Sequence, residues 1–185
     1  MPKIPTHNEI QQQINKLNEM TMDNWIYNFV FSLKWWTLLV LSIVPWFLWW
    51  KIVDKSRITE ILLYGFFIIS VSTILEVIGW NYSLWFYPDT LLGLCTPLMP
   101  MDYTLLPIFY MLAYQYFSSW KSFSIALLIL SFTFAFVLEP LAEMLNFYKT
   151  LKWNYVYSFF GYFLIGVFSR GVVLKIIKIQ KEVNR

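Results

Sequence analysis

The chain has 185 residues, of which 58% are hydrophobic, 21% aromatic and only 14% charged. Too few charged side chains remain to solvate a soluble domain of this size, so the composition indicates an integral membrane protein. The net charge of +3 is small and gives no reason to expect a nucleic-acid partner.

Residues 1–32 form a polar segment that lacks the apolar core of a signal peptide. Within it, Ile10, Ile14 and Leu17 recur at roughly helical spacing, and Trp25 continues the pattern. This spacing predicts an amphipathic helix that lies on the membrane or packs over the rest of the protein. A partly ordered surface helix is the plainer interpretation of the same pattern.

Five apolar runs follow within residues 33–175, and each is long enough to cross about 30 Å of hydrocarbon as an α-helix. We therefore predict an all-α fold: a polytopic transmembrane bundle of about five helices plus the N-terminal amphipathic helix. The predicted helices span 33–53, 58–80, 91–117, 123–146 and 155–174, and a basic tail covers 176–185. The third helix could begin near Leu91 or near Pro100, because nearby prolines allow a short re-entrant stretch over 91–99.

Basic residues set the expected orientation, because lysine and arginine in short loops stay on the cytoplasmic side. Lys51, Lys55 and Arg57 lie between the first two runs, whereas residues 81–90 contain no lysine or arginine. We therefore expect a multi-pass protein of the cell membrane with its N-terminus outside and its C-terminus in the cytoplasm. Lys149 and Lys152 count against this orientation.

Tryptophan pairs at both ends of the first run are expected to anchor it in the headgroup layers; the pairs are Trp35-Trp36 and Trp49-Trp50. The chain has one cysteine, Cys95, and one histidine, His7. These counts exclude a Ser-His-Asp triad within the membrane and a cysteine- or histidine-rich zinc site. We expect no metal and no cofactor, so any chemistry would depend on carboxyl groups and aromatic side chains.

Acidic residues that interrupt apolar runs are the main candidates for a functional site, because a carboxylate in hydrocarbon is costly and tends to face a bundle interior. Counting about 1.5 Å per residue from the cytoplasmic ends places Glu76 and Glu139 in or near the outer leaflet. Asp102 joins them if its helix begins near Pro100. We predict that these three acids share one outward-facing cavity and bind a ligand or protons.

Further residues are predicted around this cavity. Tyr110, Tyr114 and Gln115 are additional binding candidates, and they are also the expected hydrogen-bond partners if Glu76 has only a structural role. The aromatic side chains expected at the cavity rim, within the outer aromatic belt, are Trp80, Trp85, Tyr87, Trp153 and Tyr157.

Structural roles are the competing interpretations of the charged residues. Asp102 could cap the helix that follows it. Glu139 precedes Pro140 and could lie exposed at the end of its helix. Glu143 is expected to be solvated, and Arg170 is expected to extend its guanidinium toward the cytoplasmic interface.

Six short runs stand out along the chain: 84–88 (LWFYP), 100–102 (PMD), 110–117 (YMLAYQYF), 119–123 (SWKSF), 136–140 (FVLEP) and 153–159 (WNYVYSF). Together they resemble a family of small integral membrane proteins from spore-forming Bacillus and Clostridium relatives, and the resemblance extends from about Trp35 onward. Phe160 stands where relatives are expected to have a proline-containing variant. The resemblance implies a bacterial plasma membrane and a bundle of four to five helices, and it implies no activity.

Three classes of function are consistent with these features. We rank first a sensor or accessory subunit that contacts lipid or another membrane protein. A transport-linked protein that binds a cation or small molecule through the three acids comes second. An intramembrane enzyme that acts on a lipid or isoprenoid through carboxyl groups comes third.

Overall fold

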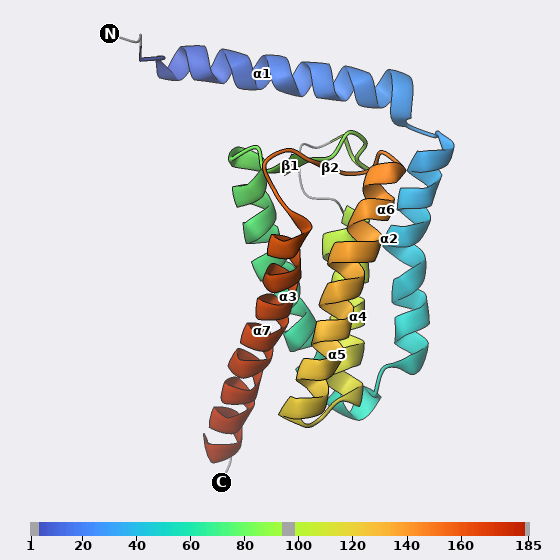
Figure 1. The fold of residues 1–185 in the computed structure, drawn as a ribbon, viewed down its shortest axis with the longest axis vertical. Helices are drawn as coiled ribbons and strands as arrows, with labels where there is room; N and C mark the ends of the chain where they lie inside the picture. The colour runs from blue at the N-terminus through green and yellow to red at the C-terminus, as the bar shows by residue number, and fades with distance from the viewer. Residues whose placement is uncertain (1–3, 94–98, 184–185) are drawn as a thin grey trace.

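A computed structural model of the protein describes residues 4–93 and 99–183. Helices make up most of the described chain, which confirms the all-α class. Figure 1 shows a bundle of elongated helices with α1 lying across one end. The helices of the chain are α1 (His7–Asn24), α2 (Leu33–Ile52), α3 (Ile58–Asn81), α4 (Leu106–Tyr116), α5 (Trp120–Thr133), α6 (Glu139–Met144) and α7 (Tyr155–Val183).

Four helical stretches in the described ranges are long and apolar enough to cross a membrane, so the chain is compatible with a multi-pass membrane protein. These stretches are Leu33–Ile52, Lys55–Asn81, Trp120–Met144 and Tyr155–Val183. They correspond to the first, second, fourth and fifth predicted runs. The last helix continues to Val183, well past the predicted boundary at 174.

The third predicted helix does not begin at Leu91, because residues 91–93 form a turn and a bend. Among the residues that the structure describes after them, helical structure is present from residue 99, close to the alternative start near Pro100. Most of the re-entrant stretch considered over 91–99, including Cys95 and Pro97, lies outside the described residues.

Besides the π-helical turn Trp25–Phe29, which follows α1, two π-helical turns interrupt the helices of the bundle, and each ends just before a proline. The first spans Met101–Leu105 and the second spans Phe134–Leu138. In each, the residue after the turn donates its N–H to the carbonyl five residues earlier: Leu106 to Met101, and Glu139 to Phe134. Proline follows at once in both cases, at Pro107 and Pro140. Because a proline ring clashes with the carbonyl four residues before it, the wider turn relieves that contact.

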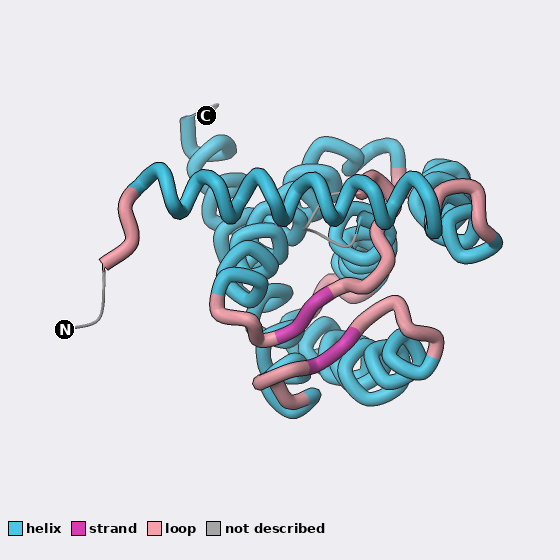
Figure 2. Tube along the Cα trace, turned by 90° about the horizontal axis from the view of Figure 1, so that it is seen from above, coloured by secondary structure: helices cyan, strands magenta, loops and turns pink. Residues whose placement is uncertain are grey.

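A short antiparallel strand pair, which the sequence did not predict, joins two loops at the end of the bundle near α1. β1 (Trp85–Phe86) pairs with β2 (Lys149–Thr150), with Trp85 opposite Thr150. The carbonyl of Leu84 also accepts hydrogen bonds from the N–H groups of Leu151 and Lys152. Figure 2 shows the two strands side by side below α1. The pair fixes the α3–α4 and α6–α7 connections to each other.

The end of the bundle away from the strands has a filled core. Tyr64, Ile61, Tyr110 and Phe123 are essentially inaccessible to solvent there, and Tyr64 stacks on Tyr114 with 4.5 Å between ring centroids. These side chains pack closely against one another, and the many van der Waals contacts between them stabilise this end of the bundle.

Two sequence predictions about this end were wrong. Trp49 is 3% exposed and packs in the core instead of facing the headgroups. Arg170 is 4% exposed, and it donates to the backbone carbonyls of Phe117 and Ser118 instead of extending to the interface. Its guanidinium also lies 4.2 Å from the ring centroid of Phe123. The carbonyls at the end of a helix lack backbone partners, and the buried guanidinium donates to them. Arg170 therefore fixes the position of the α4–α5 connection.

The amphipathic N-terminal segment forms a helix. α1 begins with a capping box, in which Thr6 and Glu9 satisfy each other's backbone N–H groups. None of its residues is buried. Beyond α1, the indole N–H of Trp25 donates to the carbonyl of Thr90 at 3.0 Å, and Lys34 pairs with Asp89 at 3.0 Å. These contacts tie the N-terminal segment, through Trp25, and the start of α2, through Lys34, to the loop that carries β1.

Candidate functional site

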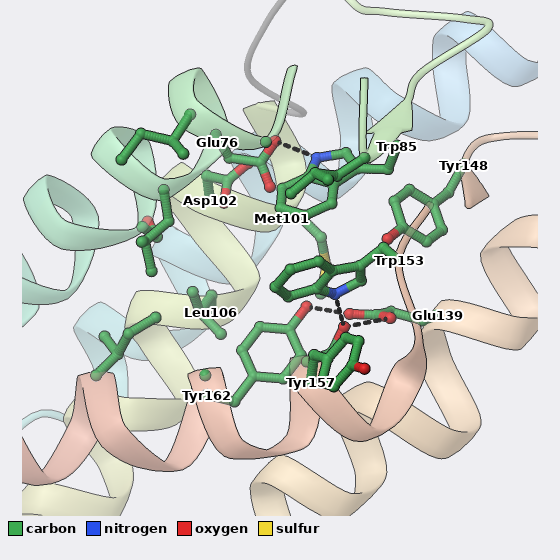
Figure 3. A pocket seen from close by; sticks show the side chains of 18 of the residues that line it. Glu76, Trp85, Met101, Asp102, Leu106, Glu139, Tyr148, Trp153, Tyr157 and Tyr162 are labelled. Atoms are coloured by element: carbon green, nitrogen blue, oxygen red, sulfur yellow. Dashed lines mark hydrogen bonds between the residues drawn. The ribbon is translucent and has the colours of Figure 1, made fainter. Parts of the chain in front are cut away.

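A cavity of about 480 Å³ lies between α3, the segment Met101–Leu106, α6 and α7, beneath the strand pair. Its wall is mostly apolar and aromatic. Three acidic side chains from three different elements line it: Glu76, Asp102 and Glu139. Figure 3 shows Glu76 and Asp102 on one side of the cavity and Glu139 with Tyr162 on the other. No lysine, arginine or histidine is among the described residues that line it.

Glu76, on α3, is held by two aromatic donors from the loop that carries β1. The indole N–H of Trp85 donates to Oε2 at 3.0 Å, and the hydroxyl of Tyr87 donates to Oε1 at 2.9 Å. Gly79, one turn further along α3, makes room for the Trp85 ring, because a Cβ there would lie 2.1 Å from Trp85 Cζ2. The carboxyl group is thus oriented by a close approach that only glycine permits.

Glu139 is 8% exposed and begins α6, directly after the second π-helical turn. The hydroxyl of Tyr162 donates to its Oε1 at 2.7 Å, and Ser158 Oγ donates to its Oε2 at 2.9 Å. The indole N–H of Trp153 in turn donates to Ser158 Oγ at 2.8 Å. The interpretation of Glu139 as an exposed helix end was therefore wrong, because a network of side chains from α7 and its preceding loop buries it.

Asp102 is 5% exposed and lies within the first π-helical turn. Both buried acids are therefore placed by a widened turn that precedes a proline. π-helical turns shift the direction of the side chains that follow, and they are frequent at functional sites. A proline five residues after Asp102 and one residue after Glu139 was the sequence signal that could have identified these turns.

Four aromatic side chains from the two paired loops close the cavity at the strand end; we call Trp85, Tyr87, Tyr148 and Trp153 the aromatic roof. Trp85 and Trp153 meet edge to face with 5.0 Å between ring centroids, and Tyr87 and Tyr148 lie 5.6 Å apart. Burial raises the pKa of both tyrosines well above the usual value for a phenol. The hydroxyl groups therefore stay neutral, and that of Tyr87 serves as a donor to Glu76.

Four of the five predicted rim aromatics line this cavity: Trp85, Tyr87, Trp153 and Tyr157. Trp80 does not. It lines a separate groove of about 270 Å³ between the N-terminal segment and the loop that carries β1.

Tyr110, Tyr114 and Gln115 do not line the cavity and do not pair with Glu76. The hydroxyl of Tyr110 donates to the backbone carbonyl of Tyr162 at 2.8 Å, and that of Tyr114 donates to Glu60 at 2.5 Å. Gln115 bonds the backbone of the α2–α3 connection. These residues lie toward the other end of the bundle, where they join neighbouring helices.

Glu143 was expected to be solvated, but it is half-buried and has three donors. The backbone N–H and the hydroxyl of Thr150 bond to its Oε1, and the hydroxyl of Tyr155 bonds to its Oε2. It orders the loop that carries β2. Ser158 and Tyr162, which orient Glu139, were not predicted, because the sequence does not reveal which face of an almost wholly apolar helix is buried.

The arrangement has the features of a small-molecule site. Each carboxyl oxygen can accept more than one hydrogen bond, so Glu76 and Glu139 keep acceptor capacity beyond their protein donors. An apolar wall with a few convergent polar groups is typical of ligand sites. In comparisons with known protein families, with curated proteins and with solved structures, nothing matches this chain.

Proposed function

We propose that this chain is a multi-pass membrane protein that binds a small molecule in the cavity described above and acts as a sensor or accessory subunit. The ligand has an apolar body and a cationic or hydrogen-bond-donating group. One observation carries the proposal: three carboxyl groups from three elements line one mostly apolar cavity that has no basic residue among its described lining. Opposite charge and charge-assisted hydrogen bonds would favour such a ligand.

The proposed topology has five passages through the membrane, with Met101–Tyr116 as the third. N-terminal α1 and the C-terminal end of α7 lie at opposite ends of the bundle (Figure 1), as an odd number of passages requires. The α2–α3 connection, with Lys55 and Arg57, and the start of α5, with Lys121, lie at the same end as the last turns of α7, which supports a cytoplasmic location for that end. The cavity would then lie in the outer half of a bacterial plasma membrane, the location implied by the family resemblance.

Binding is supported over transport by the packing of the other half of the bundle. Tyr64, Ile68, Tyr110 and Met111 are each at most 1% exposed. In the part of the chain that the structure describes, these side chains fill the space below the cavity. A transported molecule would need them to move apart, whereas a bound ligand would not.

Native mass spectrometry of protein extracted gently from its own membrane tests the proposal. We expect wild-type protein to retain a small molecule, and we expect Glu76→Gln and Glu139→Gln to lose it. Glu60→Gln is the matched control, because it neutralises an acid at the other end of the bundle. An empty cavity in wild-type protein that carries only a protein partner would contradict a ligand-binding role.

A further inference from the structure

The opening of the cavity can be located from the residues that both line it and are exposed. Four lining residues are exposed: Leu75 at 40%, Ile78 at 46%, Tyr157 at 58% and Leu164 at 61%. The first two lie on α3 and the last two on α7. The other lining residues are buried or half-buried. The cavity therefore opens on the flank of the bundle, between α3 and α7; we call these four residues the α3–α7 portal.

The two helices touch below this portal and leave space at its level. Lower in the bundle, the hydroxyl of Tyr64 on α3 donates to the carbonyl of Gly166 on α7 at 3.2 Å. A Cβ at Gly166 would lie within 3.0 Å of Leu127 and Tyr110, so packing there is tight. A Cβ at Gly161 would meet nothing within 4 Å, although Gly161 lines the cavity.

The surroundings of the portal are apolar, and the loop end of the cavity is covered. Ile74, Phe160 and Phe168 flank the portal on the outer surface and are each more than half exposed. At the strand end, the aromatic roof lies between the cavity and the solvent. A molecule dissolved in lipid would thus reach the acids more directly than a molecule dissolved in water.

We propose that the ligand is a long-chain amine that enters the cavity sideways from the bilayer through the α3–α7 portal. This inference rests on the proposed function and specifies its ligand class. The ammonium group would meet the acids Glu76, Asp102 and Glu139, and the chain would extend along the apolar wall and out through the portal. An amine is favoured over a neutral alcohol because charge-assisted hydrogen bonds are roughly twice as strong as neutral ones.

Hexadecylamine binding to the full-length protein in lipid nanodiscs tests the ligand class and the route. Hexadecanol and butylamine are the comparison probes, since one lacks the charge and the other lacks the chain. We expect hexadecylamine to bind at least about tenfold more tightly than either. Glu139→Gln should remove this preference over hexadecanol. Equal binding of all three probes, or no binding of hexadecylamine to wild-type protein, would overturn the assigned ligand.

A bulky residue at the portal tests the route separately. Gly161→Trp should lower hexadecylamine affinity about tenfold or more, because the indole would occupy the gap between the helices. Gly171→Trp is the matched control on the same helix: a Cβ there also meets nothing within 4 Å, and Gly171 does not line the cavity. Equal affinity in the two variants would overturn lateral entry while leaving ligand binding intact.

Spin labels give a second measurement of the portal that does not depend on any ligand. The relaxation rate of a spin label on Leu164→Cys, in a Cys95→Ser background, should be raised more by lipid-soluble oxygen than by a water-soluble nickel chelate. A label at Tyr82→Cys, in the exposed loop before β1, should show the opposite preference. Greater access of the nickel chelate at position 164 would show that the portal faces water, and it would refute entry from the bilayer.

Discussion

Replacing Gly79 by alanine should destabilise the protein and disturb the site together. The added Cβ would lie 2.1 Å from Cζ2 and 2.3 Å from Cη2 of Trp85, so the ring must move. Trp85 is 8% exposed and packs against Trp153, so it has little room to move. Its displacement would also break the 3.0 Å hydrogen bond to Glu76.

The size of the effect follows from three contributions. Overpacking of a tight site costs about 1–3 kcal/mol, and loss of a buried hydrogen bond costs about 1–2 kcal/mol. Alanine is favoured over glycine in a helix by about 1 kcal/mol. We expect a net loss in the free energy of unfolding of about 1–4 kcal/mol, measured by denaturant unfolding in detergent micelles.

Two further variants distinguish a clash with Trp85 from a general effect of replacing a helical glycine. Gly171→Ala should be neutral or stabilising by up to about 1 kcal/mol, because its Cβ meets nothing within 4 Å. In a Trp85→Leu background, Gly79→Ala should cost little, because the clashing ring is gone and the two changes are coupled. If Gly79→Ala proves as stable as Gly171→Ala, or costs the same with and without Trp85, the steric argument is wrong.

Other contacts give predictions of graded size. Arg170→Met should lower the free energy of unfolding by about 2 kcal/mol, because two backbone carbonyls lose a charged donor. It should also increase proteolysis of the α4–α5 connection. Lys175→Met, which changes an exposed side chain of the same helix, should alter neither measurement. Ser158→Ala should cost about 1–2 kcal/mol, by the same unfolding assay, because it removes a buried donor to Glu139. Lys34→Met should cost at most about 1 kcal/mol, since its ion pair is partly exposed, and high salt should abolish the difference from wild type.

The helical class and the approximate position of most helices could be predicted from the amino-acid sequence. Long apolar runs in a chain with 14% charged residues can satisfy their backbone groups in lipid only as helices or closed barrels, and continuous runs favour helices. Counting residues also predicted that Glu76 and Glu139 lie toward the ends of their apolar stretches, and both do, near the ends of Lys55–Asn81 and Trp120–Met144; their depth in a membrane stays a prediction. In the structure these two acids and Asp102 line one cavity, and their ligand remains a prediction.

Which side chains meet depends on how the helices pack together. α3 and α7 are apolar on most of their surface, so hydrophobic periodicity could not show which face is buried. The burial of Arg170, the pairing of Tyr114 with Glu60 and the orientation of Glu139 by Ser158 all depend on how neighbouring helices are rotated. Rotation about a helix axis is set by contacts between distant segments, which no local pattern encodes.

The strand pair and the α3–α7 portal have the same origin. β1 and β2 have two residues each, too few for an alternating pattern, and they form because two loops are brought together by the helices that carry them. The portal exists because α3 and α7 touch at Tyr64 and Gly166 and leave space at Gly161. The chain composition determined that this protein would be helical, whereas packing between helices determined where its cavity lies and on which side it opens.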